Sequence, residues 1–139
     1  MLHLIKIKFL EWGKKMIDPY KNYKNISINT MTKGELLVLL FDKLVQRLTL
    51  ATILYKDNKI EEANLNLNKS RDIFNYLLAS LDHSYGLSKD LSELYAFFNG
   101  EIIKAVAKKD ISLIEQILPM VRELRDTWVE AEKLSKKNK

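Results

Sequence analysis

The sequence predicts an all-α protein, specifically an antiparallel up-down-up-down four-helix bundle with an irregular N-terminal arm. The chain has 139 residues, of which 47% are hydrophobic, so one domain with a real core is expected. With only 4 Gly and 2 Pro, it has too little turn chemistry for a β-sandwich or a β-barrel. Apolar residues recur at alternating spacings of three and four in four successive segments, which is typical of helices with one buried face.

The start of the chain is expected to lie outside the bundle. Residues 1–16 form an apolar leader that lysines interrupt, and it lacks the layout of a secretory signal. A start codon assigned too far upstream is one hypothesis for this leader, and mass spectrometry of the native N-terminus tests it. Residues 17–31 show no sustained period and are interpreted as an arm. No apolar run approaches the roughly 18 residues that a membrane span requires.

The bundle is predicted over residues 32–135, followed by a basic tail at 136–139. The first helix opens with a capping box, in which Thr32 and Glu35 each satisfy the other's backbone N–H. The buried positions of this helix are expected at Leu37, Phe41, Leu44, Leu48, Ala51 and Tyr55.

The second helix is expected to be capped by Asn58 and to end near Gly86, a residue type that favours helix C-termini. Its buried positions are predicted at Ile60, Ala63, Leu67, Ser70, Phe74, Leu77 and Leu81.

The third helix is expected to start at Ser88, with Leu94 and Phe97 competing for its inner face. Its other buried positions are predicted at Leu91, Tyr95, Phe98, Ile102 and Ala105. The fourth helix is expected to be capped by Asp110 and to bend at Pro119. Its buried positions are predicted at Ile114, Ile117, Val121, Leu124, Trp128 and Ala131.

Charge and composition argue against several functions. The net charge is +5, but residues 1–15 carry +3 and the last seven residues carry +4, so the body carries −2 and has no surplus for a nucleic-acid face. There is no Cys, and His3 and His83 have no acid or second His at ligand spacing. We therefore expect no enzyme, no metal site and no cofactor.

Apolar residues outside the predicted core suggest a binding surface. A second stripe on the first helix consists of Leu36, Leu39, Leu50 and Ile53, and further apolar residues outside the core positions are Leu65, Tyr76, Phe97, Ile103 and Val129. If aligned on neighbouring helices, they would form grooves suited to an amphipathic partner helix. The alternative is that a bundle buries wide stripes by its own packing.

Six motifs in order resemble the FliS family of flagellar secretion chaperones over about residues 17–130. The family's Asn-Pro-Tyr-x-x-Tyr opening is matched here by Asp18-Pro19-Tyr20-x-x-Tyr23. The other five matches are Thr30-Met-Thr32-x-x-Glu35-Leu36, Leu39-Leu40-Phe41-Asp42, Lys56-Asp57-Asn58-Lys59-Ile60-Glu61-Glu62-Ala63, Leu91-x-x-Leu94-Tyr95 and Leu124-Arg125-Asp126-Thr127-Trp128. The departures are Asp18 for Asn, Lys33-Gly34 for Pro-Glu, and Lys43 for Gly.

This resemblance implies a cytoplasmic four-helix bundle that binds the disordered C-terminal segment of newly made flagellin. It also implies that the chaperone prevents premature polymerisation and delivers its client to the flagellar type III export gate. Tyr20 and Tyr23 would cover part of the empty client groove. The partner-binding residues expected are Tyr20, Tyr23, Leu36, Leu39, Leu50, Ile53, Tyr76, Phe97 and Ile103. The alternative is a non-catalytic, basic-ended bundle that docks on an anionic membrane or RNA.

Overall fold

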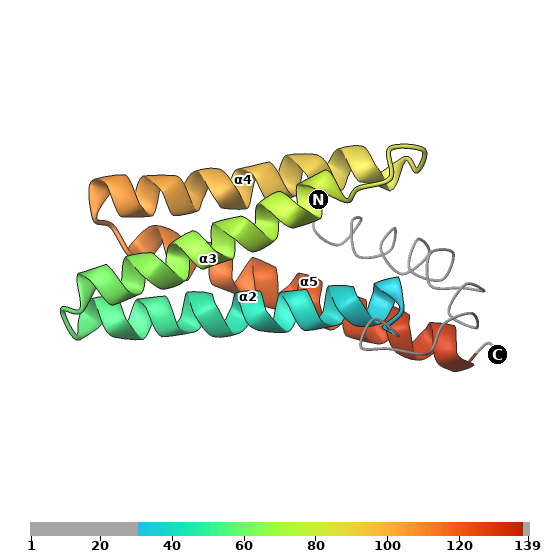
Figure 1. Cartoon of the computed structure of the whole chain (residues 1–139), viewed down its shortest axis with the longest axis horizontal. Coiled ribbons are helices and arrows are strands. Elements are labelled where there is room, and N and C mark those ends of the chain that lie inside the picture. The colour runs from blue at the N-terminus through green and yellow to red at the C-terminus, as the bar shows by residue number, and fades with distance from the viewer. Residues whose placement is uncertain (1–30, 138–139) are drawn as a thin grey trace. The chain divides into compact units, whose positions relative to one another are not determined.

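The computed structural model describes residues 31–137 (Figure 1). Within this range the chain forms four α-helices and no strand. The helices are α2 (Lys33–Lys56), α3 (Ile60–Ala79), α4 (Leu87–Lys108) and α5 (Ser112–Lys137). The prediction of an all-α four-helix bundle is therefore confirmed. The leader, nearly all of the arm with Tyr20 and Tyr23, and the last two residues of the basic tail lie outside the described residues.

The chain divides into two compact units. Lys43–Arg122 forms one unit, which contains the second half of α2, all of α3 and α4, and the start of α5. We call it the central unit. The described part of the other unit consists of residues 31–42 and 123–137, which are the beginning of α2 and most of α5. We call it the terminal unit.

The core of the central unit follows the predicted pattern, except that Tyr55, Ile60 and Leu81 are only partly buried and that Leu87 and Leu118 are buried although the sequence did not predict it. Phe74 is fully buried, and its ring centroid lies 5.4 Å from that of Phe98 and 6.1 Å from that of Tyr95. Leu94 is buried whereas Phe97 is 46% exposed, which settles the competition for the inner face of α4. Around them lie the other buried apolar side chains of this unit: Leu44, Leu48, Ala51, Ala63, Leu67, Leu77, Leu87, Leu91, Ile102, Ala105, Ile114, Ile117, Leu118 and Val121.

The link between α2 and α3 differs from the expectation. Asn58 was expected to cap α3, but it adopts a left-handed conformation with φ 62° and instead terminates α2. The Lys59 N–H donates to the Leu54 carbonyl at 2.8 Å and the Asn58 N–H to the Tyr55 carbonyl at 3.0 Å. This is the hydrogen-bond pattern of a Schellman motif, in which Asn is the usual alternative to Gly. The N-cap of α3 is Lys59, which makes no side-chain capping bond.

Helix α3 ends at Ala79, seven residues before the Gly86 that was expected to terminate it. Between this end and Gly86 the chain turns at Asp82, whose Oδ1 accepts the Ser84 N–H at 3.0 Å and the Ser84 hydroxyl at 2.6 Å. Aspartate favours such turns because its side chain competes for nearby backbone donors. Gly86 is instead the N-cap of α4, which therefore begins one residue earlier than predicted.

The link between α4 and α5 confirms the predicted cap. Asp110 Oδ1 accepts the Ser112 N–H at 3.1 Å, just where α5 begins. The preceding residue, Lys109, has φ 53°, and its position completes a second Schellman motif through the Asp110 N–H to Ala105 carbonyl bond at 3.0 Å. Pro119 lies inside α5, as expected.

In the terminal unit the two helical segments run antiparallel. The Arg125 guanidinium lies 3.5 Å from the Asp42 carboxylate, and Lys136 Nζ lies 3.8 Å from the Glu35 carboxylate. A hydrogen bond from Arg125 Nε to Asp126 Oδ1 at 2.8 Å raises the pKa of the Arg125 guanidinium. The buried apolar residues of this unit are Phe41, Leu124, Trp128 and Ala131, all predicted, whereas Leu37, also predicted to be buried, is only partly so.

The predicted capping box of α2 is present in this unit. The Thr32 N–H donates to Glu35 Oε1 at 2.9 Å, and the Glu35 N–H donates to Thr32 Oγ1 at 3.1 Å. Two of the backbone donors that every helix start leaves unpaired are therefore satisfied reciprocally.

Candidate partner-binding surface

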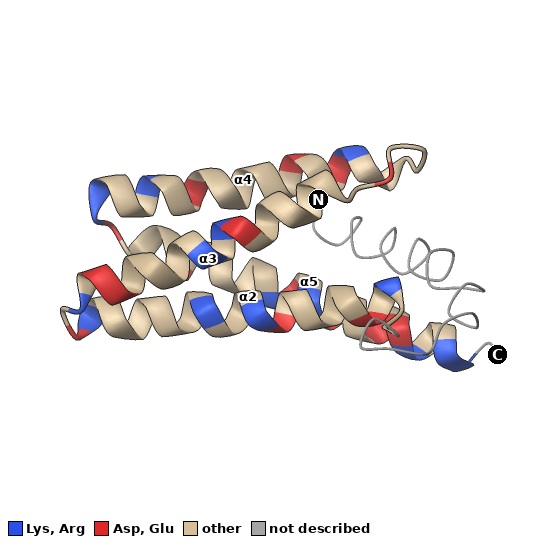
Figure 2. Ribbon diagram, in the orientation of Figure 1, with Lys and Arg blue, Asp and Glu red and all other residues tan. Residues whose placement is uncertain are grey.

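Six large apolar side chains of the central unit are between 44% and 55% exposed: Leu50, Ile53, Leu65, Tyr76, Phe97 and Ile103. All six fall at positions that the sequence placed outside the core. Charge is sparse around several of them, because residues 48–55 of α2 and residues 94–100 of α4 contain no charged side chain, and both stretches are tan in Figure 2. In the terminal unit Leu39 is exposed, whereas Leu36 and Val129 are only partly exposed.

Helix α2 faces α3 on one flank and α5 on the other. Arg47 Nη1 donates to Asn66 Oδ1 of α3 at 3.1 Å, whereas Lys56 Nζ lies 2.9 Å from Glu115 of α5. Residues three or four apart share a helix face. Leu50, three residues after Arg47, lines the pocket on the α3 side. Ile53 follows Thr49 by four residues, and the Thr49 hydroxyl accepts a hydrogen bond from Arg122 of α5, so Ile53 lies nearer α5. Leu50 and Ile53 are only three residues apart, so the stripe expected from the sequence is one face whose two members lie nearer different helices.

The exposed apolar residues of α3 share one face of the helix. Asn66 marks the α2 side of this helix, whereas Asn75 marks the α4 side because its Oδ1 accepts a 2.7 Å hydrogen bond from Asn99. Lys69 follows Asn66 by three residues. Leu65 lies four residues before Lys69, and Tyr76 lies seven residues after it. Helical spacing therefore aligns Leu65, Lys69 and Tyr76 on one exposed face of α3, between its α2 side and its α4 side.

The exposed residues of α4 lie on opposite flanks. Ile103 follows Asn99 by four residues and so shares the flank that faces α3. Phe97 precedes Asn99 by two residues, which places it about 200° away around the helix. The Phe97 ring centroid lies 5.8 Å from that of Phe98. Of the predicted residues in this unit, Leu50 therefore lies beside the α2–α3 contact, and the others are distributed around the unit.

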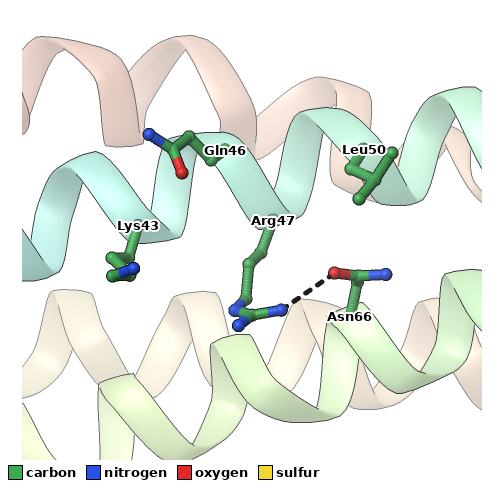
Figure 3. Close-up of a pocket in the computed structure, with 5 residues that line it drawn as sticks. All are labelled: Lys43, Gln46, Arg47, Leu50 and Asn66. Carbon is green, nitrogen blue, oxygen red and sulfur yellow. Dashed lines mark hydrogen bonds between the residues drawn. The ribbon is translucent and has the colours of Figure 1, made fainter.

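A pocket of about 150 Å³ opens beside this α2–α3 contact. Its lining residues are Lys43, Gln46, Arg47 and Leu50 of α2 and Asn66 of α3. Figure 3 shows Arg47 extending from α2 to Asn66 on α3. The pocket is smaller than the ~300 Å³ at which ordinary small-molecule sites begin, so it suits single side chains of a larger partner.

Sequence reasoning singled out Leu50 but did not include Arg47 and Asn66 among the site residues. Asn66 is buried beside the predicted core position Leu67, and its Nδ2 donates to the Glu62 carbonyl at 3.0 Å. A polar residue next to a core position was the available indication, because a buried amide needs a partner. That partner, Arg47, is 19 residues away, and helix periodicity alone does not pair them.

The described part of the chain gives no sign of metal chemistry or of a membrane segment. Residues 31–137 contain no group of three His, Cys, Asp or Glu side chains that could hold a metal ion. Nor does any helix in that range combine the length and hydropathy needed to cross a membrane.

The fold and surface define the class as a helical-bundle protein whose helices keep large apolar side chains half exposed. The model of the family described as Flagellar protein FliS matches residues 16–135, and the chain belongs to this family. The resemblance stated from the sequence motifs is thereby confirmed.

Curated relatives cover most of the chain. The protein is 27% identical over 122 residues to the Flagellar secretion chaperone FliS of Bacillus subtilis strain 168, covering 88% of this chain and 92% of the relative. It is 26% identical over 108 residues to the protein of the same name from Escherichia coli strain K12, covering 76% and 79%. Membership of this family supports a chaperone role in flagellar export.

Proposed function

We propose that this protein is a non-catalytic chaperone that binds the disordered C-terminal segment of flagellin in the cytoplasm. Bound to the chaperone, the segment is kept from premature polymerisation and held ready for type III flagellar export, with the export gate as a further partner. The observation that carries this proposal is the set of six large apolar side chains, each about half exposed, on three helices of a chain that belongs to the FliS family.

The physical basis is burial of client surface. A disordered segment loses conformational entropy when it binds, so a large apolar interface is needed for useful affinity. Apolar side chains spread over α2, α3 and α4 suit a client that wraps around the bundle, because no single flank carries all of them. The aromatic rings of Tyr76 and Phe97 offer large contact areas at low entropic cost.

Size-exclusion chromatography with two forms of flagellin tests this proposal. The chaperone is mixed with full-length flagellin from the same organism and, separately, with flagellin that lacks its C-terminal segment. Co-elution with the full-length protein alone is expected. Equal binding of both forms, or binding of neither, contradicts the proposal.

Salt dependence separates this function from docking on RNA or an anionic membrane. A protein that makes 6–10 phosphate contacts loses about 10³–10⁵ in affinity between 50 and 200 mM salt. Client binding through mostly apolar surface is expected to change by less than about tenfold over that range, since salt screens only the exposed charges. Part of the basic C-terminus is already engaged, because Lys136 lies within 3.8 Å of both Glu35 and Glu132.

A further inference from the structure

Two lysines lie at the same level on facing flanks of α2 and α3. The Arg47–Asn66 hydrogen bond fixes where the two helices meet. Because only residues 57–59 join these helices, they run antiparallel, and a step back along α2 corresponds to a step forward along α3. Lys43 lies one turn before Arg47 and lines the same pocket, and Lys69 lies one turn after Asn66. Both lysines are exposed.

The charge on this part of the surface is not balanced by its surroundings. Among residues 31–137, no carboxylate lies within ion-pair distance of Lys43, Arg47 or Lys69. Arg47 donates to the neutral amide of Asn66 instead. Two acids lie along this face of α3: Glu62, one turn before Asn66 and so away from Lys69, and the exposed Asp72, one turn beyond Lys69, which is not within ion-pair distance of it. The Lys43–Lys69 end of the surface is therefore left cationic.

The other end of the surface is apolar. Leu50 lines the pocket beside the Arg47–Asn66 contact and is 44% exposed, and Leu65, which directly precedes Asn66 on α3, is 55% exposed. Leu50 lies seven residues after Lys43, which is two helical turns, or about 10 Å along the axis. We define the α2–α3 surface as Lys43, Arg47, Leu50, Leu65, Asn66 and Lys69.

We propose that the α2–α3 surface binds an amphipathic helix of the client that carries an acidic side chain two turns away from an apolar one. The acidic side chain lies between Lys43 and Lys69, and the apolar side chain packs on Leu50 and Leu65. Charge complementarity selects this occupant, since a purely apolar helix would desolvate three cations that have no anionic partner, which is unfavourable. The inference rests on the proposed function, because it takes the client to be the C-terminal segment of flagellin.

Charge reversal tests the proposal on the intact protein. The probe is the recombinant C-terminal segment of flagellin from the same organism, titrated by calorimetry into the Lys43→Glu and Lys69→Glu variants. Each variant is expected to weaken binding about tenfold, the size of effect seen for close charge pairs at interfaces. Lys89→Glu is the matched control, because Lys89 is exposed in the first turn of α4 and lies outside the α2–α3 surface. It is expected to change affinity less than about twofold.

A charge swap on the client identifies the acidic partner. Each Asp and Glu of the flagellin segment is changed to Lys in turn, and each changed segment is titrated against wild-type chaperone and against Lys43→Glu. One change is expected to weaken binding to wild type and to recover most of the loss with Lys43→Glu. If no acidic position behaves in this way, the proposal is wrong.

The same titrations distinguish a failure of this inference from a failure of the proposed function. Circular dichroism and thermal melting establish that each variant is folded before its affinity is interpreted. If the wild type binds the segment and both lysine variants bind it equally well, this inference fails while the proposed function stands. If the wild type does not bind the segment, the proposed function itself fails. If Lys43→Glu weakens binding of a single-stranded RNA oligonucleotide but not of the segment, the cations serve a nucleic acid and the inference is overturned.

Discussion

Removing two half-exposed leucines, Leu50→Ala with Leu65→Ala, should weaken client binding without unfolding the protein. Each substitution removes three carbons, worth about 2.4 kcal/mol for complete burial at ~0.8 kcal/mol per CH₂ group. In the free protein the two residues are 44% and 55% exposed, so about half of that value is realised only when a client covers them. The double variant should therefore lose about 2 kcal/mol of binding free energy, or about 30-fold in affinity.

The assay is a fluorescence anisotropy titration of the labelled flagellin C-terminal segment, with urea unfolding of each variant alone. The same arithmetic gives a stability loss of about 2–3 kcal/mol for the double variant, which a domain of ordinary stability tolerates.

A buried leucine on the same helix is the matched control. Leu48 has no exposed surface, so Leu48→Ala should cost about 3–5 kcal/mol of stability and leave the affinity of the folded fraction unchanged. The reasoning is refuted if the folded double variant binds as tightly as wild type. It is equally refuted if Leu48→Ala, measured where it is folded, weakens binding more than the double variant does.

Three further predictions concern stability, each measured by urea unfolding. Phe74→Ala should cost about 3–5 kcal/mol because it empties the aromatic cluster in the central core, and a loss below about 1 kcal/mol would contradict that packing. Lys109→Gly should stabilise the protein by about 0.5–1 kcal/mol because Gly adopts the left-handed conformation at φ 53° without strain, so a destabilised variant would count against the Schellman assignment. Thr32→Ala should cost about 1 kcal/mol through loss of the capping bond, and an unchanged midpoint would argue that the bond contributes nothing.

The buried face of each helix was predictable from the sequence because it depends only on helix geometry. Positions seven residues apart, such as those before and after Leu48 or Ile102, lie on the same face of a helix, and the buried face requires apolar residues at that spacing. The capping box at Thr32 was predictable for the same reason, since its hydrogen bonds join residues only three apart.

The helix ends were harder to predict where two local interactions compete. Asn58 favours both an N-cap and a left-handed C-terminal position, and the five-residue spacing of the Lys59–Leu54 hydrogen bond decided for the latter. Gly86 favours a helix end, but α3 ends at Ala79 and the turn at Asp82 separates that end from Gly86. In both cases the prediction that the residue lies at a helix boundary is correct, but the predicted helix end is wrong.

The composition of the α2–α3 surface could not be predicted because it depends on which helix faces which flank. Leu50 and Ile53 belong to one outward stripe by sequence spacing, and only the contacts of Arg47 with α3 and Thr49 with α5 show that they lie nearer different helices. The same contacts determine which surface Lys43 belongs to. In the sequence it is a cation at a position where the family has glycine, whereas in the fold it lines the pocket beside the α2–α3 contact, at the level of Lys69 of α3. If this pair contacts a client acid, the substitution at this position would alter client choice rather than stability, because both side chains are exposed and neither supports the core.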